Sequence, residues 1–262
     1  MIRRSLFVLA AALLLALLTA CGGGPEGRPK VIVAAASDLR FVFEEIEPKY
    51  EALCACDLVF SFGSSGMLAT QIAQGLRVDV FASADGGYID DLGSQGLLLE
   101  GSRQLYAVGR IVLAVPADSL LGVETLADLR NPSVRRVSIA NPEHAPYGRA
   151  AKQALEKSGV WDDVQSRLVL GENASLATQF VETKNADAGI VPLSLAILRG
   201  QYLRFVLLDE SLHEPLRQVA AVMRSSKNPD KATGLLDFVN GPDGRALMRR
   251  YGFILPGESL QQ

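Results

Sequence analysis

The feature that most constrains the fold is a regular alternation of short apolar runs, rich in β-branched residues, with segments of helix length. The runs predict strands at 31–35, 58–62, 78–82, 111–115, 137–140, 168–170, 188–191, 205–208 and 219–222. After the first run, Leu39, Val42 and Ile46 recur at helical spacing, which predicts a helix that ends at Pro48. Strands separated by helices form βα units, so the sequence predicts an α/β protein with mostly parallel sheets.

The composition is that of a globular protein without strong charge bias. The chain has 262 residues, of which 48% are hydrophobic and 21% are charged. It has 26 Lys and Arg against 29 Asp and Glu, a formal net charge of −3. This length allows one or two domains with a large core. The charge balance excludes a strongly basic nucleic-acid binder, so no nucleic-acid partner is expected.

The N-terminus carries a secretory signal, predicted at 1–20. Arg3 and Arg4 precede an uninterrupted apolar run from Leu6 to Leu18, which is too short to span a bilayer comfortably. The following Thr-Ala-Cys resembles the lipobox of bacterial lipoproteins, which implies that Cys21 is lipidated. Residues 21–29 are then a flexible tether. The alternative is an ordinary cleaved signal in which this cysteine is incidental.

Cys54 and Cys56 are separated by one residue. A disulfide between them would close a small, strained ring and would be labile. A metal site would need further ligands, and no histidine or third cysteine is nearby in the sequence. We therefore predict two unpaired cysteines at a helix-to-strand junction, and no metal or cofactor.

Four strand-to-helix junctions offer small and capping residues. They are Ala36-Ser37-Asp38, Gly63-Ser64-Ser65-Gly66, Ala145-Pro146-Tyr147-Gly148 and Glu172-Asn173-Ala174-Ser175. A helix N-terminus has unpaired N–H groups and a partial positive charge, so each junction can bind an anion. Each could also be a simple helix cap. Asp38 would repel an anion if ionised, so we expect it to be a cap turned to solvent.

Several ordered segments resemble the periplasmic molybdate-binding proteins of ABC importers. The matching segments are 31–37, 61–66, 79–85, 141–148, 188–191 and 249–253. The resemblance implies a two-lobed periplasmic-binding-protein fold of type II with crossing hinge strands. Lobe one would comprise 30–111 and 219–262, and lobe two 112–218.

The resemblance also implies a set of ligand-binding residues. Ser37 and Ser65 would donate hydroxyl and backbone hydrogens from lobe one, and Tyr147 and Ala174 would donate backbone N–H groups from lobe two. The family often has a tyrosine after Gly-Ile-Val, where this chain has Pro192. Proline has no donor, so the Tyr147 phenol is a candidate replacement. A bound water, or a Tyr147 that contributes its backbone alone, remains an alternative.

The implied function is capture of molybdate, and of tungstate, for delivery to an ABC importer permease. The expected protein is a monomer, lipid-anchored outside the cytoplasm, and is not an enzyme. One alternative is a binder of another oxyanion such as sulfate or phosphate. The other is a secreted hydrolase that uses Ser65 and His144, although the chain has only two histidines and no Gly-x-Ser-x-Gly motif.

Overall fold

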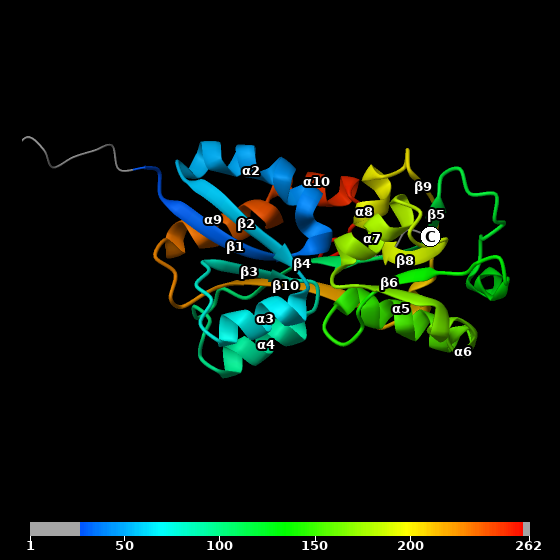
Figure 1. The fold of residues 1–262 in the computed structure, drawn as a ribbon. Coiled ribbons are helices and arrows are strands. Elements are labelled where there is room, and N and C mark those ends of the chain that lie inside the picture. The colour runs from blue at the N-terminus through cyan, green and yellow to red at the C-terminus, as the bar shows by residue number, and fades with distance from the viewer. Residues whose placement is uncertain (1–26, 259–262) are drawn as a thin grey trace, which may run out of the picture.

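The computed structural model describes residues 27–258, which form two lobes side by side (Figure 1). The predicted signal peptide, the predicted lipidation site Cys21 and most of the tether lie outside the described residues. Within the described part of the chain, no helix is long and apolar enough to cross a membrane.

Lobe one is built around a five-stranded sheet of order β2-β1-β3-β10-β4. Its elements are β1 (Lys30–Ala36), η1 (Ser37–Leu39), α2 (Arg40–Cys54), β2 (Asp57–Gly63), α3 (Ser65–Ala73), β3 (Val80–Ser83), α4 (Gly86–Ser94), β4 (Gln104–Gly109), β10 (Leu216–Val222), α9 (Pro229–Asn240) and α10 (Pro242–Arg250). Helices α2 and α9 cover one face of the sheet, and α3 and α4 cover the other (Figure 1). Because both faces are covered, β1 and β3 are almost wholly apolar.

Lobe two repeats this three-layer arrangement around a sheet of order β7-β6-β8-β5-β9. Its elements are β5 (Ile111–Pro116), η2 (Leu126–Arg130), β6 (Val137–Ala140), α5 (Pro146–Lys157), α6 (Trp161–Val164), η3 (Gln165–Arg167), β7 (Leu168–Gly171), α7 (Ala174–Glu182), β8 (Ala188–Pro192), α8 (Leu193–Leu198), β9 (Leu203–Leu207) and η4 (Glu210–Leu212). Helices α7 and α8 lie on one side of this sheet and α5 on the other (Figure 1).

Strand direction confirms the predicted α/β architecture and adds one antiparallel strand to each sheet. β1 pairs in parallel with β2 and β3, and β6 with β7 and β8. β10 is antiparallel to both of its neighbours, and β5 to both of its own. The chain enters lobe two between β4 and β5 and returns through η4 into β10. The two reversed strands are thus the first strand after each crossing.

The sequence prediction is wrong about two elements of lobe one. Strand β4 was not predicted, because its mixed pattern Gln-Leu-Tyr-Ala-Val-Gly carries little strand signal before it pairs with β10. Helix α2 does not end at Pro48 but continues to Cys54. Pro48 is exposed, whereas Tyr50 beyond it is buried and donates a hydrogen bond to the Lys231 carbonyl of α9 at 2.5 Å. This packing offsets the backbone bond that proline removes.

The prediction of two unpaired cysteines is also wrong. Cys54 and Cys56 form a disulfide, with their Cα atoms 5.2 Å apart. Between them, Ala55 is the C-cap of α2 and has a left-handed backbone with φ of 48°. This turn brings the two side chains together, which the spacing alone did not reveal.

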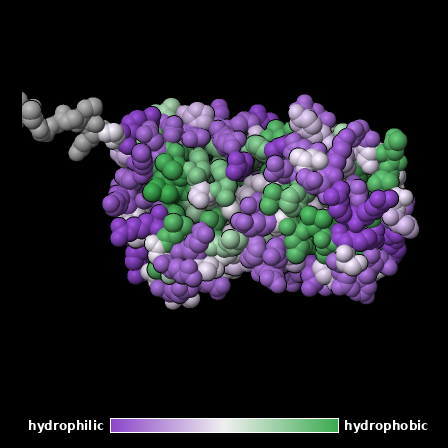
Figure 2. Space-filling view, in the orientation of Figure 1, coloured by the Kyte–Doolittle hydropathy of each residue, from purple (hydrophilic) through white to green (hydrophobic). Residues whose placement is uncertain are grey.

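The surface is mainly hydrophilic on the face drawn in Figure 2, and its hydrophobic side chains lie in separate patches over both lobes. Exposed apolar residues include Ile32 and Val59 in lobe one and Val206 and Leu207 in lobe two.

Candidate oxyanion-binding site

The predicted anion-binding junctions converge on one small cavity between the lobes. Its lining consists of Ala36, Ser37, Asp38, Gly63, Ser64, Ser65, Ala84, Ala145, Pro146, Tyr147 and Ala174. Most of these residues follow the carboxyl ends of β1, β2, β3, β6 and β7. Ligands of open α/β sheets bind at this edge. The structure thus brings together four of the five predicted ligand residues and leaves out Pro192.

Three helices begin at the cavity. Ser65 is the first residue of α3, Tyr147 the second of α5 and Ala174 the first of α7. First-turn N–H groups have no acceptor within their own helix and carry partial positive charge. Pro146 starts α5 at the position where its missing N–H is not needed. The lining therefore offers backbone donors from both lobes to one anion.

The two lobe-one serines keep their hydroxyl hydrogens available. Ser65 Oγ accepts a hydrogen bond from the Ala84 N–H at 3.0 Å. Ser37 Oγ accepts one from the Ser175 N–H at 3.2 Å, across the lobe interface. In both cases the oxygen is oriented as an acceptor, so the hydroxyl hydrogen is free to donate to a ligand.

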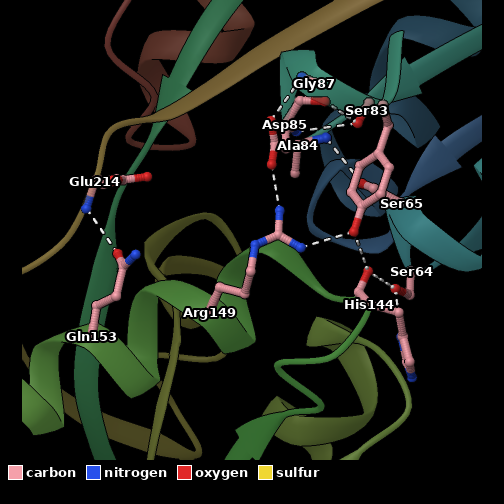
Figure 3. Close-up of polar contacts among 11 residues, drawn as sticks. Ser64, Ser65, Ser83, Ala84, Asp85, Gly87, His144, Arg149, Gln153 and Glu214 are labelled. Carbon is pink, nitrogen blue, oxygen red and sulfur yellow. Dashed lines mark hydrogen bonds and ion pairs between the residues drawn. The ribbon is translucent and has the colours of Figure 1, made fainter. Parts of the chain in front are cut away.

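Direct contacts beside the cavity hold the lobes together (Figure 3). The His144 carbonyl of lobe two accepts hydrogen bonds from Gly66 N at 3.0 Å and from Ser64 Oγ at 2.6 Å. Arg149 of α5 forms an ion pair with Asp85, the N-cap of α4, and donates to the Tyr88 hydroxyl at 2.8 Å. These contacts describe a closed arrangement of the lobes.

Asp38 does not turn to solvent, as the sequence analysis expected. Its residue surface is 2% exposed, and its Oδ2 accepts hydrogen bonds from Tyr147 Oη at 2.9 Å and Gln218 Nε2 at 2.6 Å. Because η1 directs this side chain into the interlobe core, it is shielded from water in the closed arrangement. The Tyr147 phenol gives its single hydrogen to Asp38, so the expectation that it replaces the missing anion donor is wrong.

Burial changes the acid–base behaviour of this cluster. Desolvation raises the pKa of Asp38 to about 6, although the hydrogen bonds from Gln218 and Tyr147 act in the opposite direction. Burial also raises the pKa values of Tyr147 and Tyr106 well above the ordinary value, and the nearby Asp38 charge adds to this effect. Both phenols are therefore neutral at physiological pH.

Gln218 is a polar residue beside the cavity that the sequence analysis did not point to. It is fully buried in β10, and its Oε1 accepts a hydrogen bond from Tyr106 Oη at 3.0 Å, which orients its amide toward Asp38. A signal existed in the sequence, because Gln218 is the one amide in an otherwise apolar stretch after Arg217. Buried amides are costly unless they are hydrogen-bonded, so such a position marks a polar cluster.

Pro192 and His144 are the remaining residues that the sequence singled out. Pro192 lies outside the cavity lining, and His144 does not pair with Ser65. Pro192 ends β8 opposite Ile111 and precedes α8. His144 Nδ1 lies 2.8 Å from Ser64 Oγ, not on Ser65, and the Ser64 hydroxyl already donates to a carbonyl. Residues 27–258 contain no cluster of three or more His, Cys, Asp or Glu that could hold a metal ion.

Comparison with known proteins identifies the family. The model of the bacterial extracellular solute-binding protein family matches residues 31–254. The chain belongs to this family.

This solute-binding protein is 33% identical over 228 residues to the molybdate-binding protein ModA of Azotobacter vinelandii, covering 86% of this chain and 90% of the relative. It is 31% identical to ModA of Rhodobacter capsulatus, covering 88% and 90%. The solved structure of the A. vinelandii periplasmic molybdate-binding protein matches with a TM-score of 0.81 and 29% identity, over 86% of this chain and 99% of that one. The resemblance to periplasmic molybdate-binding proteins and the two-lobed fold are thus confirmed.

Proposed function

We propose that this chain captures molybdate outside the cytoplasm and delivers it to an ABC importer permease. The observation that carries the proposal is the cavity itself. Hydroxyl and first-turn backbone donors from both lobes line it, and its lining contains no lysine, arginine or histidine. Two relatives that match 86% and 88% of the chain are molybdate-binding proteins.

A neutral donor set suits a tetrahedral dianion that must be selected by size. Every oxygen of a dianion enclosed between two lobes needs hydrogen bonds, because its charge has lost its water. The first turns of α3, α5 and α7 are rigid and hold their N–H groups at fixed positions. A long cationic side chain would adapt to anions of different size and so discriminate less. Tungstate has the same shape and charge and is the expected second ligand.

Lobe closure provides the transport step. The contacts of His144 and Arg149 with lobe one join the lobes beside the cavity, so opening must break them. We place the two crossings just before β5 and just before β10, a few residues earlier than the expected bounds of 30–111 and 219–262 for lobe one and 112–218 for lobe two. We further propose a monomer anchored through a lipid on Cys21. Capture without chemical change fits this design, so no enzymatic activity is proposed.

The test is isothermal titration calorimetry with molybdate, tungstate, sulfate and phosphate on the wild type and on Ser37→Ala and Ser65→Ala. A hydrogen bond to a charged group contributes about 1.5–3 kcal/mol. Each variant should therefore bind molybdate roughly tenfold to a hundredfold more weakly.

Ser102→Ala is the matched control, because Ser102 is a buried lobe-one serine bonded to the Leu99 carbonyl and lies outside the cavity lining. It should retain wild-type affinity. Tighter binding of sulfate or phosphate than of molybdate would reassign the ligand. Unchanged affinity in both cavity variants would place the anion elsewhere.

A further inference from the structure

Asp38 is the one carboxylic acid in the lining of the proposed anion cavity. It follows Ser37 directly and is almost fully buried. No lysine, arginine or histidine in the described residues pairs with it. An ionised carboxylate here would be an uncompensated charge facing a bound dianion, which is doubly unfavourable.

The two oxygens of Asp38 have different surroundings. Oδ2 accepts two hydrogen bonds, from the Tyr147 phenol and from the Gln218 amide, so its acceptor positions are filled. Oδ1 is buried and has no hydrogen-bond partner among the described residues. A proton on the carboxyl group therefore belongs on Oδ1, where it makes this oxygen a donor.

The neighbouring elements supply no competing charge. Tyr147 of α5 and Tyr106 of β4 are the titratable groups that face Asp38, and both are neutral phenols. Gln218 of β10 does not titrate, and Ser194 of α8 donates to the Asp38 carbonyl at 3.0 Å. Burial already holds the pKa of Asp38 at about 6 without a ligand. A dianion in the same cavity adds a repulsion that favours the neutral acid further.

We propose that Asp38 is a ligand-binding residue that acts as a neutral carboxylic acid and donates its Oδ1 hydrogen to an oxygen of the bound dianion. This inference rests on the proposed function. The acid hydroxyl adds a side-chain donor to the hydroxyls of Ser37 and Ser65 in the same lining. Above neutral pH, each captured anion then draws one proton from solvent onto Asp38. The site thereby favours tetrahedral dianions whose oxygens are all acceptors.

The experiment is titration of the mature protein with sodium molybdate from pH 6.5 to 8.5, in pairs of buffers that differ in ionisation enthalpy. The dependence of heat on buffer gives the number of protons taken up per anion. We expect close to one proton at pH 8 and a dissociation constant that rises about tenfold per pH unit above pH 7.

Asp38→Asn is the decisive variant, because its amide N–H₂ mimics the protonated acid at every pH. It should bind molybdate without proton uptake and without pH dependence, and at pH 8 about tenfold to a hundredfold more tightly than the wild type. Asp38→Ala lacks the donor and should bind more weakly than Asp38→Asn at every pH. Ser102→Ala, which lies outside the cavity lining, should retain the proton uptake.

The outcomes separate this inference from the function on which it rests. A wild type that binds none of molybdate, tungstate and sulfate at any pH would overturn the proposed function. Molybdate binding without proton uptake, or uptake that persists in Asp38→Asn, would overturn the role of Asp38 alone. Hydrogen phosphate bound more tightly as pH rises would show that Asp38 acts instead as an ionised acceptor.

Discussion

At the residue scale, burial of the Asp38 carboxyl group lowers the stability of the fold near neutral pH. The same burial favours the protonated acid, which can donate a hydrogen bond in the cavity. Its folded-state pKa of about 6 lies above the ordinary value of 3.8, so the native state binds the proton more tightly than the unfolded state. The associated stability is fully present below pH 3.8 and is lost as pH rises through about 6. From this group alone, the free energy of unfolding should fall by on the order of 3 kcal/mol, as an upper bound, between pH 4 and pH 7.

Asp38→Asn should remove this pH dependence. Urea unfolding of the ligand-free variant should show a higher free energy of unfolding than the wild type at pH 7.5, and a similar one at pH 4. The physical reason is that the amide carries no charge to bury and can still accept from Gln218 and Tyr147. If the free energies of unfolding of both proteins change with pH in parallel, then the pKa of Asp38 is not raised.

Gly66 sets how closely the lobes approach at the start of α3. A Cβ at this position would lie 2.7 Å from the His144 carbonyl oxygen and 2.7 Å from the Tyr88 hydroxyl. Gly66→Ala should therefore hinder closure and weaken molybdate binding by about 1–3 kcal/mol, the usual cost of overpacking. Calorimetry of Gly66→Ala measures this loss.

Gly122→Ala is the control for this prediction, because a Cβ there meets nothing within 4 Å. It should retain wild-type affinity. If Gly66→Ala also binds as the wild type does, then the close contact at His144 is not required for capture.

At the element scale, the end of α2 is held by local and distant contacts together. The disulfide between Cys54 and Cys56 closes a very short loop, and Lys231 of α9 donates to the Cys54 carbonyl at 2.5 Å. A short loop restricts the unfolded chain only slightly, so the chain-entropy model assigns the bond about 1–2 kcal/mol.

Reduction of the disulfide between Cys54 and Cys56 should lower the free energy of unfolding by about 1–2 kcal/mol. It should leave molybdate affinity unchanged, because the disulfide lies at the opposite end of α2 from the cavity. Urea unfolding with and without dithiothreitol tests this, with thiol titration to verify reduction. A Cys54→Ala, Cys56→Ala variant should be insensitive to the reductant. Loss of molybdate binding on reduction would instead indicate that α2 couples the bond to the site.

At the scale of the whole molecule, the binding unit and its proposed lipid attachment are separate. The described lobes contain the cavity, whereas Cys21 lies before them in the sequence. Cys21→Ser should release the protein from membranes into the soluble fraction without changing its molybdate affinity. Two or more acyl chains give stable anchoring at about 0.8 kcal/mol per buried CH₂. Cell fractionation followed by immunoblotting measures the distribution, and a variant that still pellets with membranes would contradict the lipid anchor.

The sequence by itself determined the alternating architecture and the positions of the junctions at Ser37, Ser65, Tyr147 and Ala174. Strand runs, helical spacing and capping residues are local properties, so a few neighbouring residues are enough to specify them. Within each lobe, the clustering of the junctions also followed, because the carboxyl ends of parallel strands share one edge of a sheet. That the edges of the two sheets face each other was decided by the tertiary structure.

Only the tertiary structure decided how the polar groups at this edge are paired. Asp38 meets Tyr147 from the other lobe and Gln218 from a strand 180 residues later in the chain. Whether a carboxyl group is buried, where a phenol points and which oxygen lacks a partner depend on such distant contacts, which local sequence patterns do not encode. The sequence therefore located residues that line the cavity, while the folded chain buries the one carboxylic acid among them and raises its pKa.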